Sequence, residues 1–128
     1  SNFYRNEGKD FSLIAEPGRF FCEEPFYLVS YIIDKKVLNE TIIYYIDDSL
    51  YHSFNCIHND HLNYDQGEFG KKSKIYGKTC DGTDLIFDNI LLEELNIGDC
   101  LIFPNMGAYT FSASTKFNGF LHPKIYEC

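Results

Sequence analysis

Short runs of β-branched and aromatic residues, separated by turn signals, dominate the hydrophobic pattern of this 128-residue chain. Nearly unbroken runs of such residues predict strands at residues 27–37 and 41–46. A shorter run predicts another strand at residues 100–103. Extended structure is also expected at residues 50–57 and at residues 109–114, where Tyr, Phe and Ala alternate with Thr and Ser. Strands this short and this frequent indicate an all-β domain.

The segments between these runs predict turns and loops. Residues 58–74 are polar and contain glycine, which predicts a loop, whereas residues 85–95 fit a strand followed by a short turn better than one helix. The dipeptide Asn118-Gly119 is a hairpin signal, and a last short strand is expected at residues 123–126. The whole pattern predicts a mainly β fold, either a β-sandwich or a Greek-key β-barrel.

The opening residues follow a different pattern. Residues 11–15 are a short apolar run that stops at Glu16-Pro-Gly-Arg19. A buried strand of an α/β barrel ends in this way when it delivers residues to a site at its carboxyl end. We therefore expect a boundary near residue 20, with residues 1–20 as the end of an α/β barrel and residues 21–128 as a β domain.

Composition narrows the classes of partner. The formal net charge of −8 argues against nucleic acid and anionic membranes, and no apolar run nears the roughly 18 residues of a membrane-spanning helix. Five irregularly spaced cysteines without a CxxC pair favour reduced thiols in a cytoplasmic protein, and His52, His58 and His61 match no zinc pattern. Because the chain starts at Ser1 and its only methionine is Met106, we expect a piece of a longer protein.

Potentially reactive side chains are most concentrated between Tyr76 and Asp84, in the run Tyr-Gly-Lys-Thr-Cys-Asp-Gly-Thr-Asp. A thiol, Cys80, stands beside a carboxylate, Asp81, and two glycines let the backbone turn tightly or approach a ligand. A cysteine on such a turn is partly exposed, as a reactive thiol must be. Taken alone, an ordinary turn around a small apolar cysteine explains this run better, because Asp-Gly is a common turn signal.

The same caution applies to other single residues. Asp60 and the pair Asp47-Asp48 are explained, one at a time, as charges that solvate a loop or a turn. Arg19 taken alone is a surface arginine, and Tyr109 is a strand aromatic. A functional interpretation is favoured only by the order in which short motifs follow one another along the chain.

Six motifs occur in the order Glu16-Pro-Gly-Arg19, Tyr51-His-Ser-Phe-Asn-Cys56, Asn59-Asp60-His61, Thr79-Cys-Asp-Gly82, Asn105-Met-Gly-Ala-Tyr109 and Phe117-Asn-Gly-Phe120. In this order and spacing they resemble the C-terminal half of eukaryotic-type ornithine decarboxylases, which are fold type III enzymes dependent on pyridoxal 5'-phosphate (PLP). The resemblance extends from about residue 11 to residue 126. It implies a Greek-key β-barrel or sandwich domain whose companion (β/α)8 barrel is largely absent from this chain.

The resemblance implies that this chain contributes to a PLP site. Glu16 matches the carboxylate on the pyridine nitrogen, which keeps the ring charged. Arg19 matches the phosphate-binding arginine, whose guanidinium fork suits phosphate oxygens, and Gly18 precedes it as part of the cofactor contact. Tyr109 matches the phosphate-bonding tyrosine, with Gly107 letting the backbone come close.

The resemblance also implies a substrate site. Asp60 and Asp81 match the two aspartates that hold the distal ammonium of ornithine, and Phe117 matches a phenylalanine that lines the pocket. Cys80 matches the thiol that protonates the product carbon. The implied reaction is the decarboxylation of L-ornithine to putrescine, in a cytoplasmic homodimer whose two active sites are shared between subunits.

Two departures from the family pattern leave alternatives open. Asn59 stands where the family commonly has Tyr, so a lysine or arginine decarboxylase fits as well, whereas Asp60 disfavours diaminopimelate. The barrel with the PLP-binding lysine is missing, so this piece alone should be inactive. A non-catalytic homologue of the antizyme-inhibitor kind, which binds an antizyme-like regulator, is the alternative from another class.

Overall fold

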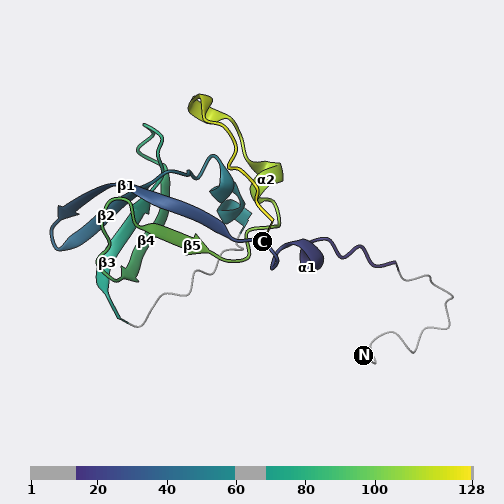
Figure 1. The fold of residues 1–128 in the computed structure, drawn as a ribbon, viewed down its shortest axis with the longest axis horizontal. Coiled ribbons are helices and arrows are strands. Elements are labelled where there is room, and N and C mark those ends of the chain that lie inside the picture. Colours follow the sequence, from purple (N-terminus) through teal and green to yellow (C-terminus); the bar gives the residue numbers. More distant parts are fainter. Residues whose placement is uncertain (1–13, 60–68, 128) are drawn as a thin grey trace, which may run out of the picture.

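The computed structural model of the chain describes residues 14–59 and 69–127. The elements in chain order are α1 (Arg19–Cys22), β1 (Leu28–Leu38), β2 (Thr41–Ile46), η1 (Ser53–Asn59), β3 (Lys71–Tyr76), β4 (Leu85–Leu92), β5 (Cys100–Phe103), α2 (Thr110–Ala113) and η2 (Phe117–Gly119), where η denotes a 3-10 helix. The strands form one curled sheet in the order β4-β3-β2-β1-β5 (Figure 1). Only β2 and β3 pair in parallel among these neighbours. The predicted mainly β fold is confirmed.

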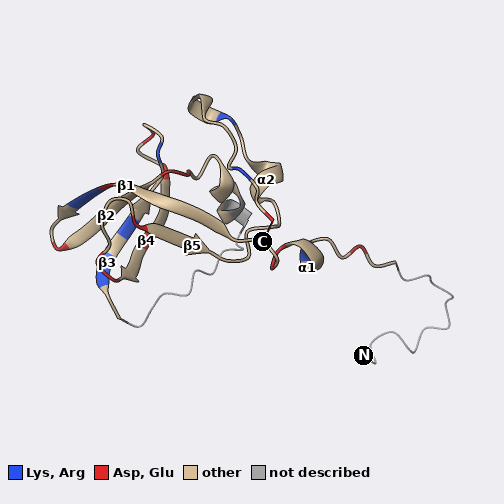
Figure 2. Ribbon diagram, in the orientation of Figure 1, with Lys and Arg blue, Asp and Glu red and all other residues tan. Residues whose placement is uncertain are grey.

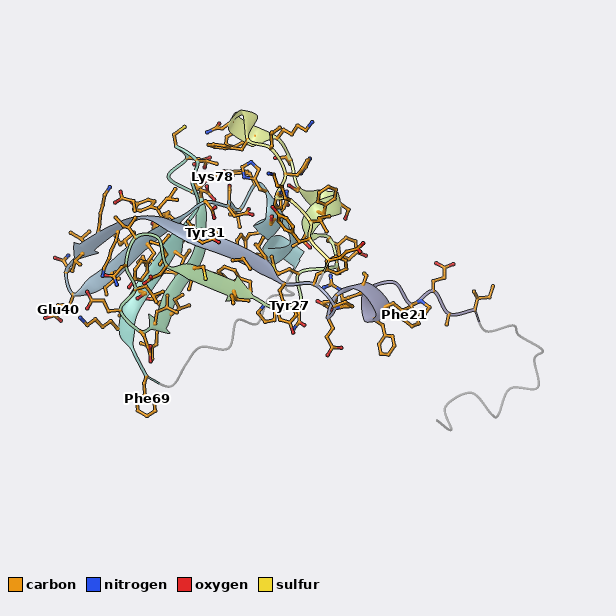
Figure 3. The ribbon with its side chains drawn as sticks, in the orientation of Figure 1. Phe21, Tyr27, Tyr31, Glu40, Phe69 and Lys78 are labelled. Carbon is orange, nitrogen blue, oxygen red and sulfur yellow. The ribbon has the colours of Figure 1, made fainter. Side chains whose placement is uncertain are left out.

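Period-two alternation gives this sheet one buried face. On β1, Leu28, Ser30 and Ile32 are buried, whereas Val29 and Tyr31 (the latter labelled in Figure 3) are exposed on the other face. The alternation continues on the neighbouring strands, and the core consists of Leu28, Ile32, Ile42, Tyr44, Ile46, Leu50, Phe54, Ile75, Ile86, Ile90, Leu92, Leu101, Phe103 and Met106. The strands predicted at residues 27–37, 41–46, 85–95 and 100–103 are confirmed as β1, β2, β4 and β5.

Basic residues of β1 and β3 gather at the end of the sheet away from α1 (Figure 2). There Glu94 forms ion pairs with Lys71 of β3 and, at 2.9 Å, with Lys35 of β1. The Lys71 and Lys35 ammonium groups lower the pKa of Glu94 to about 2. These pairs tie together strands that are not neighbours in the sheet.

The expectation that residues 50–57 are extended was wrong, because they form a turn followed by η1. The buried carboxylate of Asp48 accepts hydrogen bonds from the backbone N–H of Ser53 at 3.0 Å and from its hydroxyl at 2.7 Å, which bends the chain locally. Phe54 of η1 is then fully buried, edge to face with Phe103 at 4.8 Å between ring centroids. The interpretation of Asp48 as a solvating charge is therefore also corrected.

The neighbouring Asp47 is exposed but likewise structural. Its carboxylate accepts hydrogen bonds from the hydroxyl of Ser30 at 2.6 Å and from the backbone N–H of Tyr31 at 2.7 Å. It thereby fixes the end of β2 against β1.

Other differences lie in the polar and C-terminal segments. Residues 71–74, predicted as loop, belong to β3, where only Ser73 and Ile75 are buried and lysines occupy the outer face. Residues 109–114 contain α2 instead of a strand, because Tyr109 has the left-handed φ of 62°, which turns the chain into a helix. Within residues 121–127 no strand forms, so the last predicted strand was also wrong.

The N-terminal segment extends away from the sheet (Figure 1). Ile14 and Ala15, from the expected barrel strand, lie outside any helix or strand, and residues 11–13 fall outside the described residues. A parallel strand needs neighbouring strands for its backbone hydrogen bonds, and none of the strands in residues 14–59 and 69–127 pairs with this segment. The short α1 that follows is docked by a hydrogen bond of 3.1 Å from the Gly107 N–H to the Glu23 carbonyl.

Candidate functional site

A buried carboxylate anchors the loop between β3 and β4, which carries Cys80. Asp84 is only 1% exposed and accepts hydrogen bonds from the N–H of Thr79 at 3.1 Å and its hydroxyl at 2.6 Å. Two further donors come from the turn after β2, namely the hydroxyl of Ser49 at 3.0 Å and the N–H of Leu50 at 2.8 Å. An acceptor surrounded by donors from two segments fixes the loop against the turn.

The glycines of this loop differ from what the sequence suggested. A side chain on Gly77 would meet the Asp84 carboxylate at 2.3 Å, so the close approach at Gly77 is to Asp84 and not to a ligand. A side chain on Gly82 would meet nothing within 4 Å, and the left-handed backbone that favours glycine does not occur there. Only Gly77 is therefore required by the geometry of the loop.

Asp81 is held by neutral hydrogen-bond donors. The hydroxyl of Tyr51 donates to one carboxylate oxygen at 2.6 Å, and the N–H and hydroxyl of Thr83 both donate to the other at 2.8 Å. The Tyr51 hydrogen bond, followed by those from Thr83, lowers the pKa of Asp81, and the Asp81 carboxylate in turn raises the pKa of Tyr51. The carboxylate is thus kept as an anion in one orientation without a cationic partner in these contacts.

Cys80 lies beside this carboxylate and is exposed, as expected for a reactive thiol. The side-chain amide of Asn118 lies 3.5 Å from the Cys80 sulfur. The Phe117 ring is 4.5 Å from the Tyr51 ring, tilted by 42°. Three of the four residues predicted on the substrate side, Cys80, Asp81 and Phe117, therefore meet in one place.

The fourth predicted substrate residue, Asp60, lies outside the described residues. Tyr51, Thr83 and Asn118 were not assigned a role from the sequence. Tyr51 and Asn118 lie inside the motifs that carry the family resemblance, and that was the available signal. Their contacts join residues about 30 to 40 positions apart, which local patterns do not show.

The segment that carries Phe117 is attached to the turn after β2. The Tyr51 carbonyl accepts hydrogen bonds from the Thr115 N–H at 3.1 Å and hydroxyl at 2.7 Å. On the other side, the ammonium of Lys78 (labelled in Figure 3) lies 4.4 Å from the centroid of the Phe120 ring. The Asn-Gly turn does form, with φ of 56° at Asn118 and 76° at Gly119, although no strands flank it.

The residues predicted on the cofactor side lie on and around α1. The Arg19 guanidinium carbon is 5.1 Å from the centroid of the Tyr109 ring, so the two predicted phosphate contacts are brought together. Arg19 also forms an ion pair of 2.7 Å with Glu23, which caps the C-terminus of α1. Gly18 caps the N-terminus of α1, and Glu16 is exposed on the irregular segment before it.

This arrangement fits the phosphate end of PLP. A guanidinium and a phenol at one place are both hydrogen-bond donors suited to phosphate oxygens. Tyr109 is 54% exposed and holds a left-handed φ of 62°, which costs a non-glycine residue energy. Gly107 permits this packing, because a side chain there would meet the Cys22 carbonyl at 1.5 Å. Its close approach is thus to the backbone of α1.

Two other kinds of feature were searched for in residues 14–59 and 69–127. No group of three or more His, Cys, Asp or Glu side chains there could hold a metal ion. No helix in the same residues is both long and apolar enough to cross a membrane.

The chain is similar to known proteins in sequence and in structure. Residues 20–107 match the family described as pyridoxal-dependent decarboxylase, C-terminal sheet domain. Ornithine decarboxylase of Cricetulus griseus is 40% identical over 133 residues, covering 89% of this chain and 29% of that protein. Antizyme inhibitor 2 of Xenopus laevis is 37% identical over 146 residues, covering 98% of this chain and 32% of that protein.

The fold of the chain is similar to that of a solved structure. The lysine/ornithine decarboxylase of Vibrio vulnificus, in complex with cadaverine, superposes with a TM-score of 0.75 at 39% identity. The superposition covers 84% of this chain and 31% of that one. The chain therefore spans about a third of the length of the proteins that it matches.

Proposed function

The chain belongs to the pyridoxal-dependent amino-acid decarboxylase family, as its C-terminal sheet domain, and from this we propose that it supplies the substrate-side half of an ornithine decarboxylase site. The observation that carries the proposal is the pair formed by the exposed Cys80 and the half-buried Asp81, joined by Phe117 in one cluster. An oriented anion beside an aromatic ring suits a small cation such as the distal ammonium of ornithine. The product of the reaction is putrescine.

Each residue of the site has a separate task. When bound, PLP supplies the electron sink that decarboxylation needs. Arg19 and Tyr109 hold its phosphate, with Gly18 at the start of α1, and Glu16 offers a carboxylate to the pyridine nitrogen.

On the substrate side, Asp81 binds the distal ammonium, and its orientation is set by Tyr51 and Thr83. Phe117 covers one side of the pocket. Cys80 delivers a proton to the carbon that has lost CO2, which suits an exposed thiol next to the carboxylate that holds the other end of the substrate. Asp60 is proposed as the second carboxylate on the same ammonium, on the family resemblance alone.

The remaining parts of the proposal concern the complete protein. A preceding (β/α)8 barrel carries the lysine that binds PLP, residues 1–20 are the end of that barrel, and residues 21–128 are the sheet domain. The beginning of the family match at residue 20 supports this boundary. The protein works as a cytoplasmic homodimer in which the Cys80 loop serves a shared site, and free thiols at Cys22, Cys80 and Cys100 suit that compartment.

The direct test is an assay of the full-length protein with PLP and ornithine, lysine or arginine as separate substrates. CO2 release from ornithine with the highest kcat/KM is expected, with lysine or arginine preference as the runner-up because Asn59 alters the family pattern. A protein that binds no PLP, releases no CO2 and instead binds an antizyme-like regulator would establish the regulatory alternative. The similarity of the chain to antizyme inhibitor 2 is the observation that supports this alternative.

A further inference from the structure

His52 follows Tyr51 directly, yet its side chain points into the protein. It is only 1% exposed, and its Nε2 lies 3.1 Å from the backbone carbonyl of Phe117. Because a carbonyl can only accept, Nε2 must carry the hydrogen of this bond. The neutral ring then has a bare Nδ1, which is buried and has no hydrogen-bond partner among the described residues.

Packing alone does not explain an imidazole at this position. The ring meets Phe120 edge to face, with 5.7 Å between centroids, and a phenyl ring could make the same contact. A phenyl ring would also avoid the buried nitrogen without a partner, which costs free energy. The property that a phenyl ring lacks is the N–H donor, and that donor is used on the Phe117 carbonyl.

The turn that receives this hydrogen bond is exposed and has few bonds of its own. Residues 117–119 are exposed, and both Asn118 and Gly119 have positive φ. Within the turn, the N–H of Gly119 donates to the Lys116 carbonyl at 2.9 Å, while the N–H of Phe120 reaches the Phe117 carbonyl only at 3.4 Å. The contacts with Tyr51 and Lys78 described above attach the residues on either side and the two aromatic rings. The His52 bond adds to them a buried donor that acts on the backbone at the start of the turn.

We propose that His52 is a positioning residue which, through its Nε2–H bond to the Phe117 carbonyl, fixes the turn at residues 117–120 over the candidate site. The Phe117 ring is thereby held against Tyr51, and the Asn118 amide is held beside the Cys80 sulfur. The catalytic consequence rests on the proposed function, because it requires that Cys80 and Phe117 act on a substrate. The structural part does not depend on the reaction.

Two matched variants of the full-length protein separate the ring from its donor. His52→Phe keeps a buried aromatic ring without an N–H, and His52→Gln keeps a side-chain N–H without the ring. Amide hydrogen exchange of Gly119 and Phe120, measured by mass spectrometry on short peptides, should become about three- to tenfold faster in His52→Phe, because one hydrogen bond is lost. The His52→Gln variant should exchange within about twofold of the wild type. Unchanged exchange in His52→Phe, or equally fast exchange in both variants, would overturn the proposal.

The peptide that covers β2 is the control for folding, because its exchange should not change in either variant. If His52→Phe does not fold, the proposal is tested on the wild-type protein instead. The measurement is the tautomer of His52, determined by nitrogen-15 NMR of histidine-labelled protein. The proposal requires a hydrogen on Nε2 and a bare Nδ1. A hydrogen on Nδ1 with a bare Nε2 would contradict it, since no donor would then face the Phe117 carbonyl.

An activity readout links the turn to the chemistry. If Cys80 delivers its proton in the geometry set by Asn118, the ratio of amine formed to CO2 released should fall in His52→Phe and recover in His52→Gln. A ratio that stays at the wild-type value in both variants would remove the catalytic part of the proposal. Failure of the decarboxylase proposal itself would appear as no CO2 from any variant, while the exchange and tautomer results would still test the role of His52.

Discussion

The two groups of predicted site residues are supported in very different ways. On the substrate side, Asp81 receives three hydrogen bonds from Tyr51 and Thr83, and the loop below it is fixed by the buried Asp84. On the cofactor side, Glu16 stands exposed on an irregular segment, and Arg19 is held by one ion pair and one aromatic ring. The described members of the first group are organised by contacts within this chain, whereas Glu16, Gly18 and Arg19 of the second group lie on a segment that extends away from the sheet (Figure 1).

This difference indicates what the sheet domain contributes by itself. A carboxylate oriented by neutral donors keeps its charge available for an incoming cation and does not have to reorganise when the cation binds. The cofactor contacts have no such support within the described residues, so their geometry should depend on the part of the protein that binds the rest of PLP. Changes on the substrate side should therefore affect folding of this domain, and changes on the cofactor side should affect cofactor binding.

The largest effect on stability is expected from Asp84→Ala. Four donors would lose their buried acceptor, at about 1–3 kcal/mol for each group that finds no new partner, so the free energy of unfolding should fall by at least about 3 kcal/mol. Urea unfolding followed by circular dichroism measures this change. The matched control is Asp88→Ala, which removes an exposed carboxylate paired with Lys74 and should cost much less. Equal losses in the two variants would mean that Asp84 is not the anchor of the loop.

Arg19→Ala should leave the stability of the domain nearly unchanged and weaken the binding of PLP. The ion pair of Arg19 joins the first residue of α1 to the residue that caps its C-terminus and is partly exposed, so the free energy of unfolding should change by less than about 0.5 kcal/mol. PLP affinity of the full-length protein should fall by about 1.5–3 kcal/mol, the usual contribution of a charged hydrogen bond. Titration of the variant with PLP, followed by absorbance, measures the loss. A large loss of stability with unchanged PLP affinity would reverse the roles assigned to the two regions.

The smallest change in free energy is expected from Tyr51→Phe, and it is measured as a change in the pKa of Asp81. The variant removes the strongest cause of the low pKa of that carboxyl group. The pKa of Asp81 should rise toward 3.8, and Thr83→Val should raise it less, because the backbone N–H of Thr83 remains. Carbon-13 NMR titration of the Asp81 carboxyl group measures both shifts. Since the folded-state pKa is depressed, this carboxylate stabilises the fold above pH 3.8 and loses that contribution as the pH falls through its folded value. An unchanged pKa in Tyr51→Phe would show that the hydroxyl does not orient Asp81.

The sequence predicted those strands whose buried side chains alternate. β1, β2 and β5 are rich in β-branched and aromatic residues and were found near their true bounds. β3 was missed because lysines cover its outer face and only Ser73 and Ile75 lie inside. The 3-10 helix η1 was predicted as a strand, because the decisive hydrogen bonds that Ser53 donates are accepted by the Asp48 carboxylate, which looked like a solvated charge.

The candidate site was found from the order of its motifs and not from local pattern. That order pointed to Cys80, Asp81 and Phe117, which the structure brings together. It gave no sign of the supporting contacts of Tyr51 and His52, because these join segments far apart in the chain through single hydrogen bonds. The sequence contains the residues of the site, whereas only the fold shows which neighbours hold them.

The role of Asp81 as the anion for a distal ammonium is tested most directly by a pair of substrates. Norvaline has the carbon chain of ornithine without the distal amine, so the ratio of kcat/KM for ornithine over norvaline measures recognition of that amine alone. The full-length protein should prefer ornithine by about 10⁴-fold or more, because with norvaline the Asp81 carboxylate would be covered by the substrate without a cationic partner. Asp81→Asn should lower this preference by at least about 100-fold. Comparable kcat/KM for the two substrates in the wild type, or an undiminished preference in Asp81→Asn, would contradict the assignment of Asp81.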